Sequence, residues 1–430
     1  MHATAQRFCR SPHPREQRGA VAIIVALSGV ALLGFAGIAL DAGHLYVNKA
    51  ELQTAADACA LAASSELTCN PAGGTCPGSF LLNAQAAGIF AAGRNKRDFQ
   101  STGVTIAAAD VTFSTTLAPN SNYLSIAGGA SNNSRYVMCT ARATGIAPWF
   151  MAAVGSGPQT VTASAVATLA PAQSFCNAAP VGVCDKPGGY TAGEWITSDF
   201  TGNSDDSELI GDFKWVDFTP GGGGTTEARE QLVGREGVCN IHVGDDIALP
   251  GQKQGIKFAY NTRFGIYKNG ANAYTSADAP PDRTGYAYPN KAPGAPVYPI
   301  PTGVPPIGSV YQDYKAHQGS NTKFTSAEYA PTGADGNIPG APIEPAEHEA
   351  TGSDRRLVAA PLIDCAGVGS TTPIISMACV LMLNPMSNGA TGKIYLEYRG
   401  DASDPASGCR TGGVPGGTTS TGPQVPTLVQ

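Results

Sequence analysis

The sequence predicts an α+β protein. An N-terminal transmembrane helix continues into a helix-plus-antiparallel-sheet domain, and a loop-rich, mainly β second domain follows. Residues 20–40 are an uncharged apolar run, and residues 44–67 continue it with good helix formers. Later segments rich in Val, Ile, Thr and Tyr are typical of strands. The 53 glycines and 32 prolines among 430 residues indicate many turns and argue against a mainly helical chain.

The apolar run over 20–40 reads AVAIIVALSGVALLGFAGIAL, and Ser28 is its only strongly hydrogen-bonding side chain. A helix rises about 1.5 Å per residue, so this run reaches roughly the 30 Å thickness of a hydrocarbon core. A cleaved signal peptide has a shorter apolar stretch and a small-residue cleavage site. A buried core helix without any charge over this length is uncommon. We therefore expect one transmembrane helix over 20–40.

The charges that flank the run predict its orientation. Cationic flanks stay in the cytoplasm. We therefore expect residues 1–19 to be a cytoplasmic segment and the bulk of the chain to lie outside the cytoplasm. The residues before the run that carry charge are Arg7, Arg10, Arg15, Glu16 and Arg18.

The first extracytoplasmic domain is expected over 41–170. Its helix over 44–67 continues the membrane span, so that 20–67 forms one long helix with a small-residue face suited to close packing. The face consists of Leu45, Leu52, Ala56, Cys59 and Ala63. A turn over 68–78, a second helix over 81–97 and three strands over 104–113, 136–144 and 160–169 follow.

One apolar segment of this domain, residues 146–158 (IAPWFMAAVGSGP), lies between two of those strands. It is a turn or a short helix. Its composition suits packing on the sheet and contact with the membrane equally.

The second domain is expected over 176–400, after a boundary near residues 170–175. Residues 276–352 are dense in Pro, Gly, Ala and Tyr and show no period that buries a face, so they predict an extended insertion. Buried strands follow over 357–365, 374–385 and 393–400. Residues 401–430 are rich in Gly, Thr, Ser and Pro and predict a disordered tail.

Eleven cysteines indicate an oxidising compartment, because Cys9 precedes the apolar run and an even number, ten, follows it. Free, buried thiols are the alternative. Proximity in sequence favours three pairs and leaves Cys59, Cys139, Cys239 and Cys409 without assigned partners. The three pairs are Cys69–Cys76, Cys176–Cys184 and Cys365–Cys379.

Motifs for enzyme chemistry are missing from the sequence. It contains no Gly-x-Ser-x-Gly elbow, no His-Glu-x-x-His, no phosphate-binding Gly-x-x-x-x-Gly-Lys and no Cys-x-x-Cys. The net charge of −6 gives no electrostatic reason to expect nucleic-acid binding. We therefore expect a non-enzymatic protein without a metal, a cofactor or a small-molecule substrate.

Four weaker constellations have simpler explanations. His242 near Asp245 and Asp246 reads as a polar turn rather than an acid/base pair. The acidic stretch 203–208 reads as a solvated turn rather than a calcium loop. Residues 344–349, with Glu344, Glu347, His348 and Glu349, read as solubilising charge, and the glycines 221–224 as a flexible turn.

Residues 18–64 resemble the N-terminal region of TadG-like proteins of the Tad (tight adherence, Flp pilus) assembly system. Residues 148–169 also look like the strand pair that closes the first domain of that family. The segments 176–184, 211–224, 243–251 and 261–270 are similar, more loosely, to the C-terminal region of its longer members. The matching features before residue 65 are Arg18, Gly19, Gly34, Gly37, Asp41, Gly43, Leu45, Tyr46, Leu52, Gln53, Ala55, Ala56, Asp57 and the run 58–62.

The resemblance implies a pilin-like, single-pass protein of the bacterial inner membrane that assembles or anchors type IVb-like pili. Its partners would be other pilus-assembly or pilin-like proteins. No Glu follows Gly19 at the spacing of a prepilin peptidase site, which favours a retained anchor. No Asp-x-Ser-x-Ser motif occurs either, so the metal-dependent adhesion of some relatives is not expected.

Two other functions remain open from the residues. An exported adhesin or ligand-binding protein could use the tyrosines of the insertion for contact. An envelope hydrolase could use His242 with Asp245 or Asp246. The tyrosines in question are Tyr274, Tyr286, Tyr288, Tyr298, Tyr311 and Tyr314.

Overall fold

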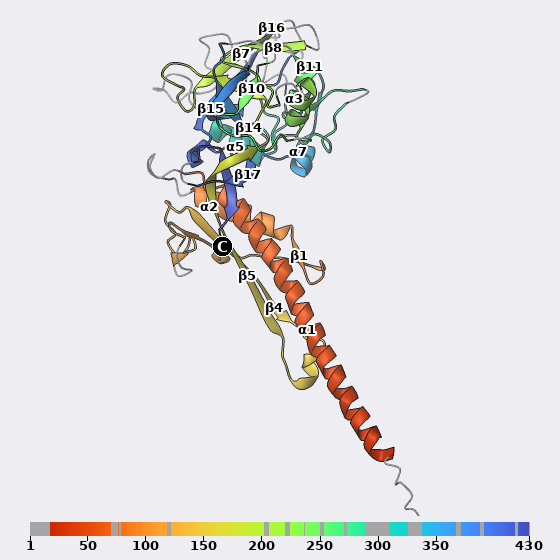
Figure 1. Ribbon diagram of the computed structural model, residues 1–430. Coiled ribbons are helices and arrows are strands. Elements are labelled where there is room, and N and C mark those ends of the chain that lie inside the picture. Colours follow the sequence, from red (N-terminus) through yellow and green to blue (C-terminus); the bar gives the residue numbers. More distant parts are fainter. Residues whose placement is uncertain are drawn as a thin grey trace, which may run out of the picture.

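The structure is a computed structural model of the chain. It describes residues 18–69, 76, 79–117, 122–201, 206–219, 224–235, 237–249, 253–270, 273–288, 309–325, 338–366, 371–387, 391–417 and 420–429. The described residues form an elongated molecule, in which a long N-terminal helix extends away from a β-rich body (Figure 1).

The long helix is α1, Arg18–Ser65, which is uninterrupted over 48 residues. It follows closely the single helix expected over 20–67. Helix α2, Ser79–Gly93, packs against the C-terminal half of α1. Gly88 permits this close approach, because a Cβ there would lie 3.0 Å from the carbonyl oxygen of Cys59. The second helix ends before residue 97, since the short strands β1, Lys96–Arg97, and β2, Thr102–Gly103, follow it.

The sheet that covers α1 contains five described strands, in the order β17-β5-β4-β3, with β18 also paired to β5. Buried alanines, valines and cysteines of α1, α2 and this sheet form one hydrophobic core. The strands are β3, Val111–Ser114; β4, Tyr136–Ile146; β5, Gln159–Cys176; β17, Gly412–Pro415; and β18, Gln424–Leu428.

Strand β5 joins the two halves of the molecule. It runs unbroken through the boundary expected near 170–175, and its two parts pair with different partners. The disordered tail expected over 401–430 is also wrong for its described residues. Strands β17 and β18 lie there and pair antiparallel with β5. Backbone hydrogen bonding to an available strand edge outweighs the low strand propensity of these Gly- and Pro-rich segments.

The β-rich body is built on a second sheet with nine described strands, in the order β11-β8-β7-β16-β15-β14-β6-β9, with β10 paired to β15. Its long central strands include the three expected after residue 356. The strands are β6, Val181–Cys184; β7, Trp195–Thr201; β8, Asp206–Gly211; β9, Phe213–Trp215; β10, Asp246–Ala248; β11, Lys253–Gln254; β14, Leu357–Ile363; β15, Thr371–Met382; and β16, Thr391–Asp401.

The β-rich body also contains short helices and one small strand pair, β12 with β13. The buried apolar side chains of α3 and α4 belong to the main hydrophobic core of the body. These elements are α3, Gly224–Val233; α4, Ile256–Thr262; α5, Tyr311–Gly319; α7, Pro345–Thr351; β12, Ile266–Tyr267; and β13, Ala341–Pro342.

The insertion expected over 276–352 is not simply extended, because its described parts contain α5, β13 and α7 and bury side chains. Asp282 organises them. Its fully buried carboxylate accepts hydrogen bonds from the Tyr314 hydroxyl at 2.8 Å and from the backbone N–H of Arg355 and Arg356 at 2.8 and 3.1 Å. A polar network thus orders this region where the apolar pattern is too weak to predict it.

In sum, the sequence predicted the class of fold correctly: the chain mixes helix and sheet, with an N-terminal apolar helix and a β-rich C-terminal region.

Candidate functional site

Residues 21–40 of α1, which we call its bare inner half, are largely not covered by the other described parts of the chain. Among the described residues it is the one helix long and apolar enough to cross a membrane. Its large apolar side chains between residues 21 and 40 are all more than half exposed, so lipid or other helices must cover them in any stable state. These side chains are Val21, Ile23, Ile24, Val25, Leu27, Val30, Leu32, Leu33, Phe35, Ile38 and Leu40.

Residues 41–65 of α1, which we call its outer half, have one face buried instead. Leu52, Ala56, Cys59 and Ala63 of the face predicted from the sequence are fully buried against α2 and the five-stranded sheet. Cys59 is covalently bonded to Cys139 of β4. Near residue 41, α1 therefore changes from an exposed helix to a helix that packs in the hydrophobic core.

Asp41 marks that change. Its buried carboxylate accepts backbone hydrogen bonds from Trp149 at 2.7 Å, Phe150 at 3.0 Å and Met151 at 2.6 Å. These three residues lie in the loop between β4 and β5, more than 100 positions along the chain. Burial alone would raise the pKa of Asp41, but the N–H donors of Met151, Trp149 and Phe150 hold its pKa below the usual value. The carboxylate is therefore charged at neutral pH and holds this loop against the helix.

The loop packs closely on both sides of Asp41. Toward the N-terminus of α1, a Cβ on Gly37 would lie 2.8 Å from the Cβ of Phe150, so only glycine fits without a shift. Toward its C-terminus, the His44 ring stacks on Trp149 with centroids 4.4 Å apart. His44 Nε2 also lies 2.7 Å from Oδ1 of Asp98. Residues 146–155, which we call the hairpin tip, are thus fixed to one level of α1.

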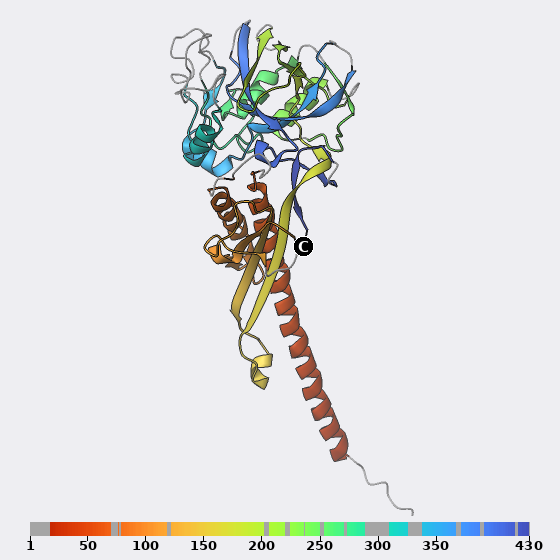
Figure 2. The same ribbon diagram turned by 90° about the vertical axis from the view of Figure 1, so that its left-hand side faces the viewer.

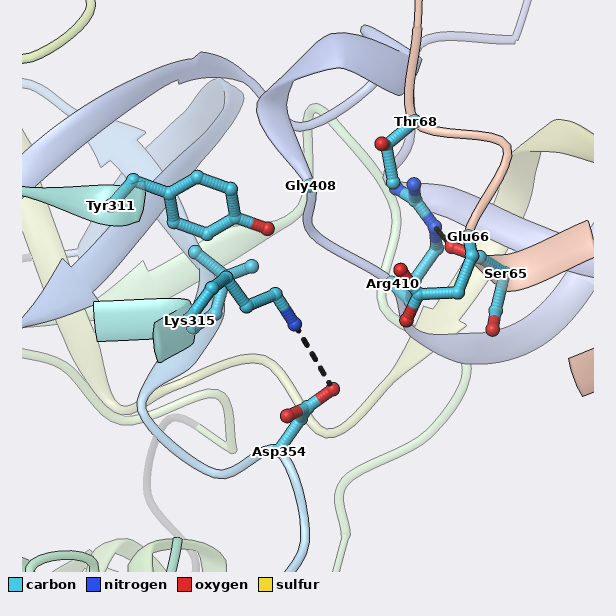
Figure 3. Close-up of a pocket in the computed structure, with 9 residues that line it drawn as sticks. Ser65, Glu66, Thr68, Tyr311, Lys315, Asp354, Gly408 and Arg410 are labelled. Carbon is cyan, nitrogen blue, oxygen red and sulfur yellow. Dashed lines mark hydrogen bonds and ion pairs between the residues drawn. The ribbon is translucent and has the colours of Figure 1, made fainter. Parts of the chain in front are cut away.

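The far end of α1 is tied to the β-rich body (Figure 3). The Nε of half-buried Arg410 donates to the carbonyl oxygen of Ser65 at 2.8 Å, which satisfies a free carbonyl and complements the negative end of the helix dipole. Burial lowers the pKa of Arg410 to about 10, so it remains charged at neutral pH. Beside it, Tyr311, Lys315 and Asp354 line a cavity of about 100 Å³.

The residues carried by the family resemblance fall into three groups. Gly37 and Asp41 contact the hairpin tip, and Asp57 accepts a hydrogen bond from Gln53 one turn earlier at 2.8 Å. Tyr46 is 75% exposed, and a Cβ on Gly34 or Gly43 would meet nothing within 4 Å. Arg18 and Gly19 are the first residues of α1. The importance of these residues remains a prediction.

Sequence reasoning missed the partner of Asp41, because hydrogen bonds to backbone N–H groups leave no trace in side-chain identity. The available signal was the aromatic, uncharged segment between two strands, for which contact with the sheet and contact with the membrane were left open.

The structure contains five disulfides among the described cysteines. Cys69–Cys76 is the pair expected from proximity. The other two expected pairs are wrong: distant strands bring together cysteines that are far apart in sequence, and each cysteine bonds outside its own loop. The four remaining bridges are Cys59–Cys139, Cys176–Cys239, Cys184–Cys365 and Cys379–Cys409.

Where the structure describes them, the weaker constellations are not assembled into a site. Asp245 accepts from the backbone N–H of His242 at 2.7 Å, and both side chains are exposed at a turn. His348 is buried with its Nδ1 2.7 Å from the carbonyl oxygen of Asp282, so it is structural rather than solubilising. Residues 203–205 and 221–223 lie outside the described part. Within that part, no group of three His, Cys, Asp or Glu is placed to hold a metal ion.

Most of the described tyrosines that were expected to form a contact surface are not free to do so. Tyr286, Tyr288 and Tyr314 are buried, Tyr274 and Tyr311 are partly buried, and Tyr298 lies outside the described residues. The structure thus removes the main observation that favoured an adhesin.

A comparison with known protein families gives a match, and it lies mainly on helix α1. Residues 19–72 match the family described as putative Flp pilus-assembly TadE/G-like. The N-terminal region of this chain is therefore similar to that family. The match covers α1 from its second residue, and so includes the bare inner half, Asp41 and the buried outer half. A search of curated proteins and a search of solved structures each found no match.

Proposed function

We propose that this chain is a membrane-anchored structural or assembly component of a Tad/Flp-type, type IVb-like pilus, without enzymatic activity. The observation that carries the proposal is the division of the TadE/G-like helix into a bare apolar half and a half built into a folded body. Such a helix offers a long packing surface for other helices while its outer end holds a domain.

The arrangement of α1 suits a mechanical role. The hydrogen bonds of Asp41 and the Cys59–Cys139 bridge tie the helix to the five-stranded sheet, and the contact of Arg410 with Ser65 ties its end to the residues between β16 and β17. A force applied to the helix is therefore passed to the sheet at several levels. The sheet beside α1 then serves as a pilin-like domain, with the β-rich body as the exposed outer part.

We further propose that the chain is a single-pass protein of the bacterial inner membrane, with its N-terminus in the cytoplasm and its body in the periplasm or cell exterior. The arginines before residue 20 support this orientation, and the disulfides require an oxidising compartment. Other pilus-assembly or pilin-like proteins are its partners. Glycines of the span, such as Gly29 and Gly34, lie open on the bare surface, where they let a second helix approach closely.

Deletion of the gene in the source bacterium tests the function. We expect loss of surface pili, and recovery when the wild-type chain is supplied from a plasmid. A matched variant carries leucine at Gly29 and Gly34, which keeps the span hydrophobic but blocks close helix contact. It should reach the membrane at wild-type levels and fail to restore pili. Normal piliation after deletion, together with purification of the chain free of any pilus-assembly protein, would contradict the proposal.

A further inference from the structure

The hairpin tip, residues 146–155, has a composition unsuited to water. No Asp, Glu, Lys, Arg or His occurs from residue 143 to residue 160. Trp149 and Phe150 nevertheless have 54% and 51% of their surface exposed. Exposed aromatic side chains of this size, side by side on a loop, usually have a partner.

The place of the tip along α1 identifies that partner. Its backbone is bonded to Asp41, the first charged residue after the apolar run, and Phe150 packs on Gly37, one turn inside that run. Because the tip is fixed to the helix at this level, any bilayer that holds residues 20–40 brings its polar boundary to Trp149. Figure 2 shows the β4–β5 hairpin descending beside α1 while the helix continues past its tip.

Charges lie on the outward side of the tip. Arg97 and Asp98 line a cavity together with His44 and Trp149, and Arg142 of β4 is exposed. Lys49 is exposed two helical turns beyond Asp41. Moving outward along α1, the order is therefore an apolar run, an aromatic level and then charged residues, among which Arg97, Arg142 and Lys49 are cations. This is the order of the hydrocarbon core, the interfacial belt of Trp and Tyr, and the lipid headgroups.

We propose that the hairpin tip is a second membrane contact, which inserts Trp149 and Phe150 into the interfacial layer of the outer leaflet beside the span. The stack of Trp149 on His44 and the three hydrogen bonds to Asp41 fix the ring in place before insertion. A span together with a rigid wedge sets both the height and the tilt of the outer body over the membrane. The inference rests on the membrane span and is independent of the pilus assignment.

Fluorescence quenching of the full chain in vesicles tests the contact. The chain has three tryptophans, and the variant with Trp195→Phe and Trp215→Phe leaves Trp149 as the only one. The vesicles contain phosphatidylglycerol and phosphatidylcholine, with part of the latter brominated on its acyl chains. We expect the brominated lipid to remove most of the Trp149 emission and aqueous acrylamide to remove little. The matched variant Trp149→Phe reports Trp195 and Trp215 in β7 and β9, and should be insensitive to bromine.

Two outcomes overturn the proposal. Quenching of Trp149 by acrylamide but not by brominated lipid places the tip in water. Protection from both quenchers places it against a second copy of the chain. In either case, flotation of the protein with the vesicles shows that the span itself is inserted, so failure of the tip contact is distinct from failure of the anchor.

A second measurement needs no substitution. Hydroxyl-radical footprinting of the unmodified protein in the same vesicles compares Trp149 with Phe90, which is 58% exposed on α2. We expect Trp149 to be oxidised several-fold less than Phe90, although its indole ring is the more reactive. Oxidation of Trp149 at or above the level of Phe90 overturns the proposal.

Discussion

The Cys59–Cys139 bridge is the covalent link between α1 and the sheet, and its removal should loosen that link more than any other local change. Both cysteines are fully buried, so alanine at each position removes the bridge without adding a polar group. The bridge spans a sequence separation of 80, for which chain-entropy theory gives a stabilisation of about 4.5 kcal/mol. Each 1.4 kcal/mol is a factor of ten, so opening should become about three orders of magnitude more frequent.

Hydrogen exchange followed by mass spectrometry measures this effect locally, because amides of β4 exchange only when the strand separates from its neighbours. The matched control is alanine at Cys69 and Cys76, whose separation of 7 gives a stabilisation of only about 2.4 kcal/mol. We expect protection of β4 to fall far more in the Cys59–Cys139 variant than in the control. Equal protection of β4 in the two variants would refute the view that this bridge joins helix and sheet.

Three further predictions concern other contacts. Alanine at Gly37 should displace Phe150, because its Cβ would lie 2.8 Å from that side chain, and should increase amide hydrogen exchange in the hairpin tip. Alanine at Gly34, where a Cβ meets nothing within 4 Å, should leave that exchange unchanged. Since the folded-state pKa of Asp41 is lowered, its contribution to stability is present above the unfolded value of 3.8 and is lost as pH falls through the folded value. In a chain that keeps only Trp149 and carries phenylalanine at His44, whose ring stacks on Trp149, the fluorescence should therefore be constant from neutral pH down to pH 4 and change below it. Alanine at Asp282 leaves several buried donors unpaired at about 1–3 kcal/mol each, so chemical unfolding of the β-rich body should need clearly less denaturant. Each contact would be contradicted by its own result. These results are equal hydrogen exchange in the Gly37 and Gly34 variants, Trp149 fluorescence that does not change below pH 4, and an unchanged denaturant midpoint for the Asp282 variant.

The parts of the fold that the sequence predicted are those set by local pattern. The uncharged run predicts the exposed inner half of α1, and the small-residue face predicts its buried outer half. The three strands after residue 356 are continuous apolar segments. The Cys69–Cys76 pair was accessible because a short turn brings its cysteines together.

The parts that were missed depend on contacts between distant segments. The partner of Asp41 is a backbone more than 100 residues away, and four of the bridges join cysteines at separations from 30 to 181. Strands β17 and β18 form because β5 offers them an edge, which no property of residues 401–430 reveals. Tyr286, Tyr288 and Tyr314 are buried, and polar contacts such as that of Tyr314 with Asp282 have no periodic signature in the sequence.

The central claim is that the bare half of α1 packs against other pilus-assembly helices in the membrane. A photo-crosslinking residue at Leu33, which is 75% exposed, tests it in the living cell, with the fully buried Leu52 as the matched position. The account predicts that illumination links the Leu33 variant to a pilus-assembly or pilin-like protein and that the Leu52 variant gives only internal links. Recovery of the Leu33 variant without any protein adduct, in cells that assemble pili, would contradict it.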